Sequence, residues 1–165
     1  MDQAIIREYR ESDLIEVSNL VDEFQDYLIS LDHLSRMRRL PSYGTEHTNS
    51  ILKEVGEQSG KLLLATDNNR VIGLIAGTIK LQTPEDLLES NPTVDGRVTE
   101  LYVSPSYRNS GIGKILMEKM EAYLIERGCN AIRIFVFESN VLARNFYEKL
   151  GYEERLIDLI KIVKD

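Results

Sequence analysis

The stretch Arg108-Asn109-Ser110-Gly111-Ile112-Gly113 decides the fold, because it joins a predicted strand to a predicted helix. The strand is the apolar run at residues 98–103, which Pro105 ends. The helix is indicated by apolar residues that recur at helical spacing: Ile112, Ile115, Leu116, Met120, Tyr123 and Leu124. Gly111 and Gly113 are therefore expected at the start of this helix.

A glycine-rich helix start of this kind is suited to bind phosphate. The first backbone N–H groups of a helix have no intrahelical acceptor, and the helix dipole is positive at this end. Glycines keep side chains away from these N–H groups, and Arg108 adds a cationic side chain beside them. The sequence therefore predicts a ligand that carries a phosphate or pyrophosphate group.

Two common nucleotide-binding patterns do not match this loop. A Walker A loop ends in Gly-Lys-Ser/Thr, but Gly113-Lys114 is followed by Ile115, and Arg108 stands where the first glycine belongs. A dinucleotide-binding fold has a third glycine where this chain has Leu116, and its motif lies near the first strand rather than late in the chain. Neither pattern therefore accounts for the loop.

The composition is that of an ordinary globular protein. The chain has 165 residues, 42% hydrophobic and 28% charged, which fits a single domain spanning 1–165. Its apolar runs are too short to cross a bilayer, and residues 1–4 lack the features of a signal peptide. Cys129 is the only cysteine, which excludes an internal disulfide and favours a cytoplasmic location. A net charge of −7 disfavours nucleic acid as a partner.

Strands and helices are expected to alternate along the chain. Strands are predicted at residues 4–8, 61–66, 70–81, 98–103, 131–137 and 154–163. Helices are predicted after an N-cap at Ser12, at 45–57, from 112 to about 127 and at 140–150, with a loop or short helical turn at 83–95. Asp67-Asn68-Asn69 predicts a hairpin turn, and Gly128 and Gly151 are expected to end helices. This order predicts an α/β (α+β) fold, a mixed central sheet of six to seven strands with helices on both faces.

A second motif lies downstream: Asn140-x-x-Ala143-x-x-Phe146-Tyr147-x-x-Leu150-Gly151-Tyr152. Together with Leu101-Tyr102-Val103-x-Pro105 and Arg108-x-x-Gly111-x-Gly113, it resembles the GNAT superfamily of N-acetyltransferases. The specific part of the resemblance spans about 97–152, and the order of the N-terminal elements also matches that fold. The resemblance implies one GNAT domain with a coenzyme A-binding core at about 97–152 and acceptor-side elements at about 12–58 and 82–95.

The resemblance implies acetyl-coenzyme A as the acetyl donor and no metal ion. The strand that carries Leu101, Tyr102 and Val103 would be bulged and splayed from its neighbour, so that the pantetheine arm pairs with its backbone. Asn140 would also contact coenzyme A, although an asparagine at this position is equally an N-cap. The pyrophosphate would lie on the loop formed by Arg108, Asn109, Ser110, Gly111, Ile112, Gly113 and Lys114.

Two residues are candidates for catalysis. Tyr147 would lie near the thioester sulfur and protonate the leaving thiolate; the alternative is a core aromatic, since Leu142, Phe146 and Leu150 form an apolar stripe beside it. Glu100 is the candidate general base for the acceptor ammonium; the alternative is a carboxylate that hydrogen-bonds a neighbouring strand or loop. Strict strand alternation places Glu100 on the face of Val98 and Tyr102, opposite Leu101 and Val103, but a bulge would break this alternation.

The acceptor is not identified by the sequence. The resemblance places the acceptor pocket near His33, Tyr43, His47 and the cluster Arg36, Arg38 and Arg39. If this cluster faces the cleft, it would favour an acceptor with a carboxylate or phosphate; the alternative is a solvated charged loop. Glu85, Asp86 and Glu89 in a later loop would favour a cationic acceptor. The sequence predicts acetyl transfer to the primary amine of a small molecule or peptide, by direct attack in a ternary complex. The alternative is an acyl-coenzyme A-binding sensor or interaction module without turnover, and a homodimer is common in the family.

Overall fold

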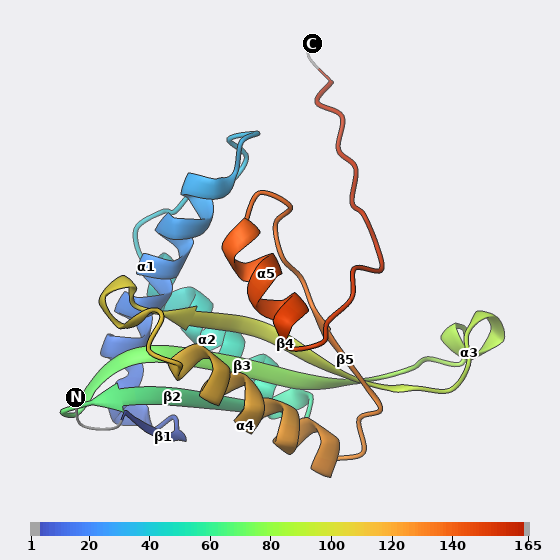
Figure 1. The fold of residues 1–165 in the computed structure, drawn as a ribbon, viewed down its shortest axis with the longest axis horizontal. Coiled ribbons are helices and arrows are strands. Elements are labelled where there is room, and N and C mark those ends of the chain that lie inside the picture. The colour runs from blue at the N-terminus through green and yellow to red at the C-terminus, as the bar shows by residue number, and fades with distance from the viewer. Residues whose placement is uncertain (1–3, 164–165) are drawn as a thin grey trace. The chain divides into compact units, whose positions relative to one another are not determined.

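The computed structural model describes residues 4–163 (Figure 1). Residues 1–3, on which the signal-peptide argument partly rests, and residues 164–165 lie outside this range. The chain divides into two compact units, residues 1–135 and residues 136–165. Within the described range, no helix combines the length and the apolar character that a membrane span requires.

The first unit contains a mixed sheet of five strands in the order β1-β2-β3-β4-β5. The strands are β1 (Ile5–Glu8), β2 (Lys61–Asp67), β3 (Arg70–Leu81), β4 (Val94–Val103) and β5 (Ala131–Ile134). The helices of this unit are α1 (Leu14–Leu31), α2 (Tyr43–Glu57), the short α3 (Asp86–Glu89) and α4 (Ile112–Glu126). Neighbouring strands are antiparallel except β4 and β5, which are parallel. The second unit contains α5 (Val141–Lys149).

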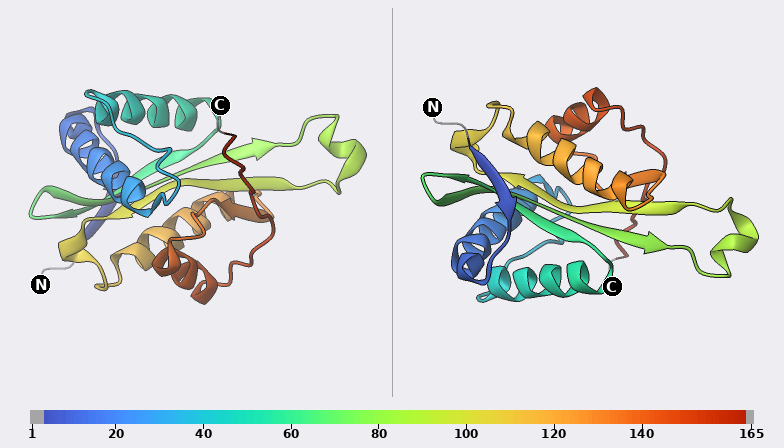
Figure 2. Two further views of the ribbon diagram at one scale, coloured as in Figure 1. Left: turned by 90° about the horizontal axis from the view of Figure 1, so that it is seen from above. Right: turned by 90° about the horizontal axis from the view of Figure 1, so that it is seen from below.

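Helices cover both faces of the sheet, as expected from the sequence. Figure 2 shows α1 and α2 on one face and α4 on the other. The central strands β2 and β3 are buried almost throughout, because both of their faces are covered. Helix α4 packs closely on its face: a Cβ at Gly77 would lie 2.6 Å from the Met120 sulfur, and one at Gly96 would lie 2.9 Å from Leu124.

The sheet has five strands rather than six to seven, and two strand predictions are wrong in detail. Residues 154–163 form no strand, although apolar side chains such as Leu156 and Ile157 suggested one; both are exposed. Apolar, β-branched character forms a strand only where the backbone finds a hydrogen-bonded neighbour. The strand predicted at 131–137 ends at Ile134, where its pairing with β4 also ends.

The turn predictions are confirmed. Asn68 and Asn69 have φ values of +47° and +66°, as the tight hairpin between β2 and β3 requires. Gly128 and Gly151 each have a φ of +89° just beyond the ends of α4 and α5. The prediction of Ser12 as an N-cap is wrong, because Ser12 lies in a 3-10 turn and α1 begins at Leu14.

Candidate functional site

Strand β4 contains a bulge at Thr99 that determines where Glu100 points. The pairing with β3 skips Thr99, so that Val98 lies opposite Gly77. Gly77 faces α4, and Val98 therefore lies on the α4 face of the sheet. After the bulge, Glu100 and Tyr102 share the opposite face, which α1 and α2 cover. The bulge expected in this strand is thus present.

Beyond Val98, β4 extends past the end of its partner β5. Their pairing covers Asp95–Val98 alone, whereas β4 continues to Val103. The Ser104 N–H donates to the Ile72 carbonyl of β3 at 2.9 Å, which fixes the alternation of backbone groups along β4. Leu101 and Val103 therefore direct their N–H and C=O groups away from β3, toward the side where β5 has ended. An extended amide-bearing ligand could pair with this exposed stretch.

The glycine loop leads into the N-terminus of α4, as predicted. Gly111 is the N-cap and has a φ of +87°, a left-handed conformation that favours glycine. Without a side chain at the N-cap, the N–H groups of Ile112, Gly113 and Lys114 begin the helix uncovered. These donors and the positive helix end together form a suitable site for an anion.

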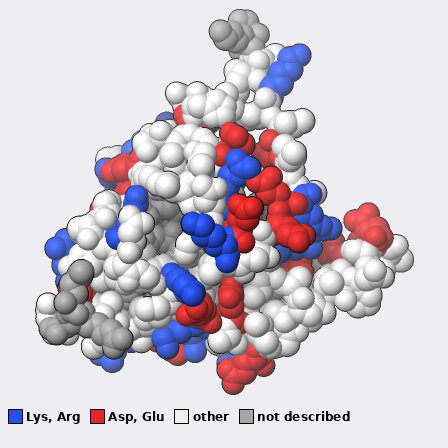
Figure 3. Space-filling model, viewed as in Figure 1, with Lys and Arg blue, Asp and Glu red and all other residues white. Residues whose placement is uncertain are grey.

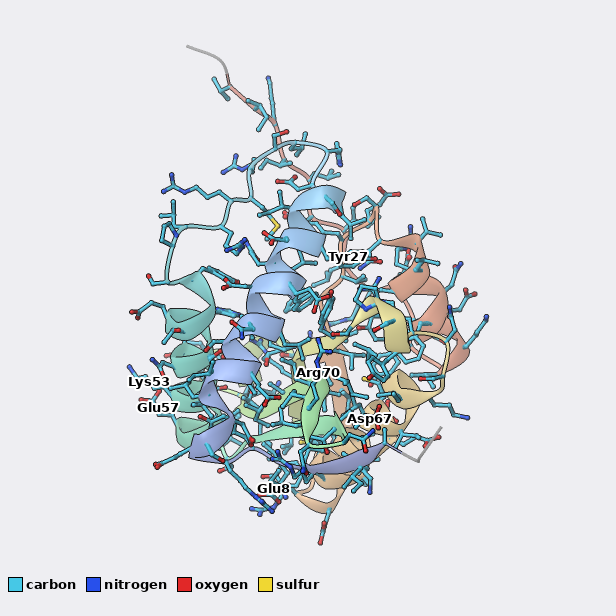
Figure 4. All side chains as sticks on the ribbon, turned by 90° about the vertical axis from the view of Figure 1, so that its left-hand side faces the viewer. Glu8, Tyr27, Lys53, Glu57, Asp67 and Arg70 are labelled. Carbon is cyan, nitrogen blue, oxygen red and sulfur yellow. The ribbon has the colours of Figure 1, made fainter. Side chains whose placement is uncertain are left out.

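Two hydrogen bonds, both of which involve Tyr107, hold the loop in place. The Ser110 hydroxyl donates to the Tyr107 carbonyl at 2.5 Å, which closes the loop on itself. The Tyr107 hydroxyl donates to the Asp67 carboxylate at 3.1 Å, which ties the loop to the hairpin between β2 and β3. Figure 4 shows Asp67 beside Arg70 at this hairpin. The loop is thus preorganised by the adjacent Tyr107 and, through it, by Asp67 on a distant hairpin.

Arg108 turns back toward β4 and α1. Its Nε donates to the Val103 carbonyl at 3.0 Å, one of the groups that β4 directs away from β3. Its guanidinium carbon lies 4.6 Å from the ring centre of Tyr27, labelled in Figure 4, and 5.2 Å from that of Tyr102. Tyr102 in turn stacks on Phe24 at 5.0 Å. Arg108 therefore braces the end of β4 against α1, and its contact with a pyrophosphate stays a prediction.

The Glu100 carboxylate forms a hydrogen bond with a histidine from another element. His47 on α2 places its Nε2 2.9 Å from Oε1 of Glu100. The Glu100 side chain is 14% exposed and that of His47 is 34% exposed, so the imidazole is the more accessible partner. The Glu100 carboxylate, which accepts this hydrogen bond, raises the pKa of His47 above its usual range.

Tyr43 completes this cluster from the same helix as His47. Its ring stacks on the imidazole with the ring centres 5.1 Å apart and the planes 15° from parallel. Burial raises the pKa of the Tyr43 hydroxyl to about 12, and the nearby negative charges of Glu100 and Asp22 contribute. Tyr43 is therefore neutral at physiological pH and supports the imidazole as an uncharged aromatic face.

Close packing between α1 and α2 positions His47. A Cβ at Gly44 would lie only 2.3 Å from the Ser18 carbonyl oxygen of α1, so glycine is required for this approach. Thr48, adjacent to His47, is fully buried, and its hydroxyl donates to the Gly44 carbonyl at 2.7 Å. The ring of His47 is thereby anchored through the backbone next to it.

In the second unit, α5 carries the two remaining candidates. Asn140 is the N-cap, and its side chain accepts a hydrogen bond from the Ala143 N–H at 3.2 Å. Tyr147 is buried and makes edge contacts with Phe146 and Tyr152 at 5.3 Å and 5.9 Å between ring centres. Burial raises the pKa of its hydroxyl above the usual range. Leu142, expected in the apolar stripe, is instead 75% exposed.

A family model described as the acetyltransferase (GNAT) family matches residues 20–152. The chain belongs to the GNAT acetyltransferase family. The matched region contains β4, the glycine loop, α4 and α5, together with the α2 helix that carries His47. The family resemblance of the two sequence motifs is thereby confirmed.

Solved structures share this fold over nearly the whole chain. A tetramutant of the BH1408 protein from Bacillus halodurans has a TM-score of 0.82 at 20% identity, covering 96% of this chain and 99% of that one. An aminoglycoside 6'-N-acetyltransferase from Acinetobacter haemolyticus has a TM-score of 0.69 at 17% identity, covering 97% of this chain and 99% of that one. An aminoglycoside N-acetyltransferase solved in complex with CoA has a TM-score of 0.67 at 18% identity, covering 96% of this chain and 100% of that one. These similarities establish a common GNAT fold.

Several other charged residues of this GNAT protein are occupied by local contacts. Arg39 pairs with Asp26 of α1 at 2.7 Å, and Asp32 accepts backbone N–H groups of the loop that follows it. Asp86 accepts the Thr83 N–H at 2.8 Å and thereby stabilises the turn that contains α3. Neither Arg39 nor Asp86 is therefore a free charge that would identify the acceptor.

Other charged and nucleophilic side chains among the described residues have surroundings that differ from those of this site. On the face shown in Figure 3, basic and acidic side chains are interspersed. Among residues 4–163, no three His, Cys, Asp or Glu side chains are grouped to hold a metal ion. Burial and the nearby Asp95 raise the pKa of the Cys129 thiol, which disfavours its reactive thiolate form. His33 lies exposed in a turn, whereas His47 is held by Glu100.

Proposed function

We propose that this protein transfers an acetyl group from acetyl-coenzyme A to the primary amine of a small molecule or peptide. The observation that carries the proposal is the combination of the outward-facing backbone of β4 with the uncovered N-terminus of α4. Both features belong to one continuous segment of the first unit, and the family match spans both. They offer complementary partners to the two halves of the donor, its amide-bearing arm and its phosphates.

The donor would lie along this segment. The amides of the pantetheine arm would pair with the Leu101 backbone groups and the Val103 N–H, which lie beyond the end of β5. The Val103 carbonyl already accepts the hydrogen bond from Arg108. The pyrophosphate would accept hydrogen bonds from the N–H groups of Ile112, Gly113 and Lys114. The structure of a related fold in complex with CoA supports coenzyme A as the ligand class.

The acetyl group would move by direct attack. The neutral amine nitrogen attacks the thioester carbonyl carbon, and an outward N–H of β4 near Val103 stabilises the resulting oxyanion. The C–S bond then breaks, and Tyr147 donates its proton to the departing thiolate. The raised pKa of Tyr147 keeps its hydroxyl protonated, as this role requires. Holding both reactants in one complex removes much of the entropic barrier.

The acceptor is proposed to be a cationic amine of low molecular weight or a peptide N-terminus. The net charge of −7 favours a cationic acceptor, and Arg39 of the arginine cluster is already paired with Asp26. Two proteins that share the fold are aminoglycoside N-acetyltransferases. Amino acids, polyamines, aminoglycosides and peptide N-termini are therefore the acceptors to test first.

The proposal is tested by two measurements on the purified protein. Calorimetry with acetyl-coenzyme A is expected to show saturable binding, and a thiol-release assay across the amine panel is expected to show turnover with at least one acceptor. Binding without turnover for any amine would contradict the transferase and favour an acyl-coenzyme A sensor. Absence of binding would contradict both functions.

A further inference from the structure

The Glu100 side chain is less exposed than the imidazole that is hydrogen-bonded to it. His47 Nε2 lies 2.9 Å from Oε1, and the imidazole is more than twice as exposed as the carboxylate, 34% against 14%. An ammonium group that approaches from solvent can therefore reach the histidine more readily than the carboxylate. The same order, carboxylate behind imidazole, orients the general base in many acyl-transfer enzymes.

We infer that His47 takes the proton from the acceptor ammonium and that Glu100 is a positioning residue which holds and polarises the imidazole. The inference rests on the proposed transferase function. It assigns the role of general base to His47 rather than to Glu100. The residue that contacts the substrate is then on α2, and β4 contributes the orienting charge.

The hydrogen bond defines which ring nitrogen reacts. An ionised carboxylate can only accept a hydrogen bond, so Nε2 of His47 must carry the proton that Glu100 accepts. In the neutral imidazole, Nδ1 then carries the lone pair that can take a proton. The stacked ring of Tyr43 fixes the imidazole plane, and buried Thr48 anchors the adjacent backbone. The lone pair of Nδ1 is thereby held in one direction.

The charges around His47 favour a strong base. Glu100 faces it from β4, Glu54 lies on the same helix, and Asp22 of α1 lies near Tyr43. Glu100 and Glu54 raise the pKa of the imidazole, whereas burial lowers it. A more basic imidazole is better matched to an alkylammonium, whose pKa is about 10.

The reaction releases one proton overall. One proton leaves the ammonium for Nδ1 of His47 and passes to solvent after the reaction. The neutral nitrogen attacks the carbonyl carbon, and the thiolate takes the Tyr147 proton as the C–S bond breaks. The second proton that the nitrogen loses passes to solvent and restores the Tyr147 hydroxyl. The products are the acetamide, coenzyme A with a free thiol and one released proton. No oxidant, reductant or metal ion takes part in these steps.

The test compares His47→Gln and Glu100→Gln with Glu57→Gln, an exposed carboxylate on α2 that pairs with Lys53 (both labelled in Figure 4). With an accepted amine near neutral pH, His47→Gln is expected to lower kcat/KM for the amine by about 10²-fold or more, and Glu57→Gln to leave it unchanged. The loss should shrink near the pKa of the amine, where the free base is already present in solution. Calorimetry should show unchanged acetyl-coenzyme A binding for every variant.

The pH profile separates the two possible bases. On the acid side of the pH profile, kcat/KM should fall as His47 becomes protonated, with a midpoint above about 6.5, the ordinary pKa of histidine. In Glu100→Gln this acid limb of the profile should move to lower pH. If Glu100 itself were the base, His47→Gln would not remove this limb. Retention of wild-type kcat/KM by His47→Gln would overturn the inference alone, whereas absence of turnover in the wild type would overturn the proposed function with it.

A second readout needs no acceptor. The chain has two histidines, so nuclear magnetic resonance of the His33→Gln variant reports on His47 directly. We expect a neutral ring protonated at Nε2 and a titration that shifts to lower pH when Glu100→Gln is added. A neutral ring protonated at Nδ1 would contradict the geometry, and so would a His47 titration that is unchanged by Glu100→Gln.

Discussion

At the scale of residues, one extra amino acid in β4 determines the face of the sheet on which Glu100 lies. Without the bulge at Thr99, Val98 and Glu100 would lie on one face of the sheet. With the bulge, Glu100 turns toward α2 and Val98 toward α4. The sequence identified Glu100 as a candidate but could not give its direction, because a bulge depends on pairing with β3. It could not give its partner either, since His47 lies 53 positions away.

Replacing Tyr147 with phenylalanine tests the proposed general acid. Tyr147→Phe keeps the buried ring but removes the hydroxyl, so we expect kcat in the thiol-release assay to fall by about 10²-fold while acetyl-coenzyme A binding persists. Tyr123→Phe is the matched control, because its hydroxyl only donates to the Ser59 and Gly60 carbonyls. Unchanged turnover of Tyr147→Phe at saturating acceptor would show that Tyr147 is a core aromatic.

At the scale of elements, the site depends on how closely α2 approaches α1. The contact is formed at Gly44, where no side chain fits against the Ser18 carbonyl. The periodicity of α2 predicted a helix at 45–57, and the structure extends it to Tyr43. Periodicity shows which face of a helix is apolar, but the partner and the distance of approach follow from packing.

Two glycines on α2 allow a matched test of this contact. In Gly44→Ala the new Cβ would meet the Ser18 carbonyl oxygen at 2.3 Å, so we expect a loss of about 1–3 kcal/mol in the free energy of unfolding. In Gly56→Ala the Cβ meets nothing within 4 Å, so a gain of up to about 1 kcal/mol is expected from helix propensity. Denaturant unfolding measures both changes. A Gly44→Ala protein as stable as Gly56→Ala would contradict the close approach.

Pushing α2 away from α1 in Gly44→Ala should also affect His47. Because Gly44 and His47 share the first turns of α2, Gly44→Ala is expected to weaken the hydrogen bond to Glu100 and lower the pKa of His47. The pair stabilises the folded state fully below about 6.5, where His47 is also protonated in the unfolded chain. This contribution is lost as the pH rises through the raised pKa of the folded state. In Gly44→Ala the loss should therefore occur at lower pH than in the wild type.

At the scale of the whole molecule, donor binding should stabilise the fold. Acetyl-coenzyme A would bind the native β4 and α4 but not an unfolded chain, so a concentration of 100 times Kd should add about 2.7 kcal/mol. For a chain of this size we expect Tm to rise by about 5–10 °C in thermal unfolding. Adenosine, which lacks both the pyrophosphate and the pantetheine arm, serves as the control. A Tm that no coenzyme A thioester raises would contradict a ligand-binding role for this segment.

Features that depend on local backbone chemistry could be predicted from the residues alone. The positive φ at Gly111 and in the Asn68-Asn69 turn, the N-cap at Asn140 and the helix stops at Gly128 and Gly151 all follow from what those residues can adopt. Gly111, Asn140 and Gly151 belong to the motifs that indicated a GNAT acetyltransferase. The local backbone geometry of these motifs was therefore predictable, whereas their contacts with the donor stay a prediction.

Features that require a partner distant in the chain became apparent in the folded structure. The absence of a strand at 154–163 and the early end of β5 at Ile134 depend on which strands find a neighbour. The turn of Arg108 onto Tyr27 and the pairing of His47 with Glu100 depend on how the helices pack on the sheet. Hydrogen-bond ladders and packing join residues far apart in sequence, so periodicity and turn chemistry leave them open.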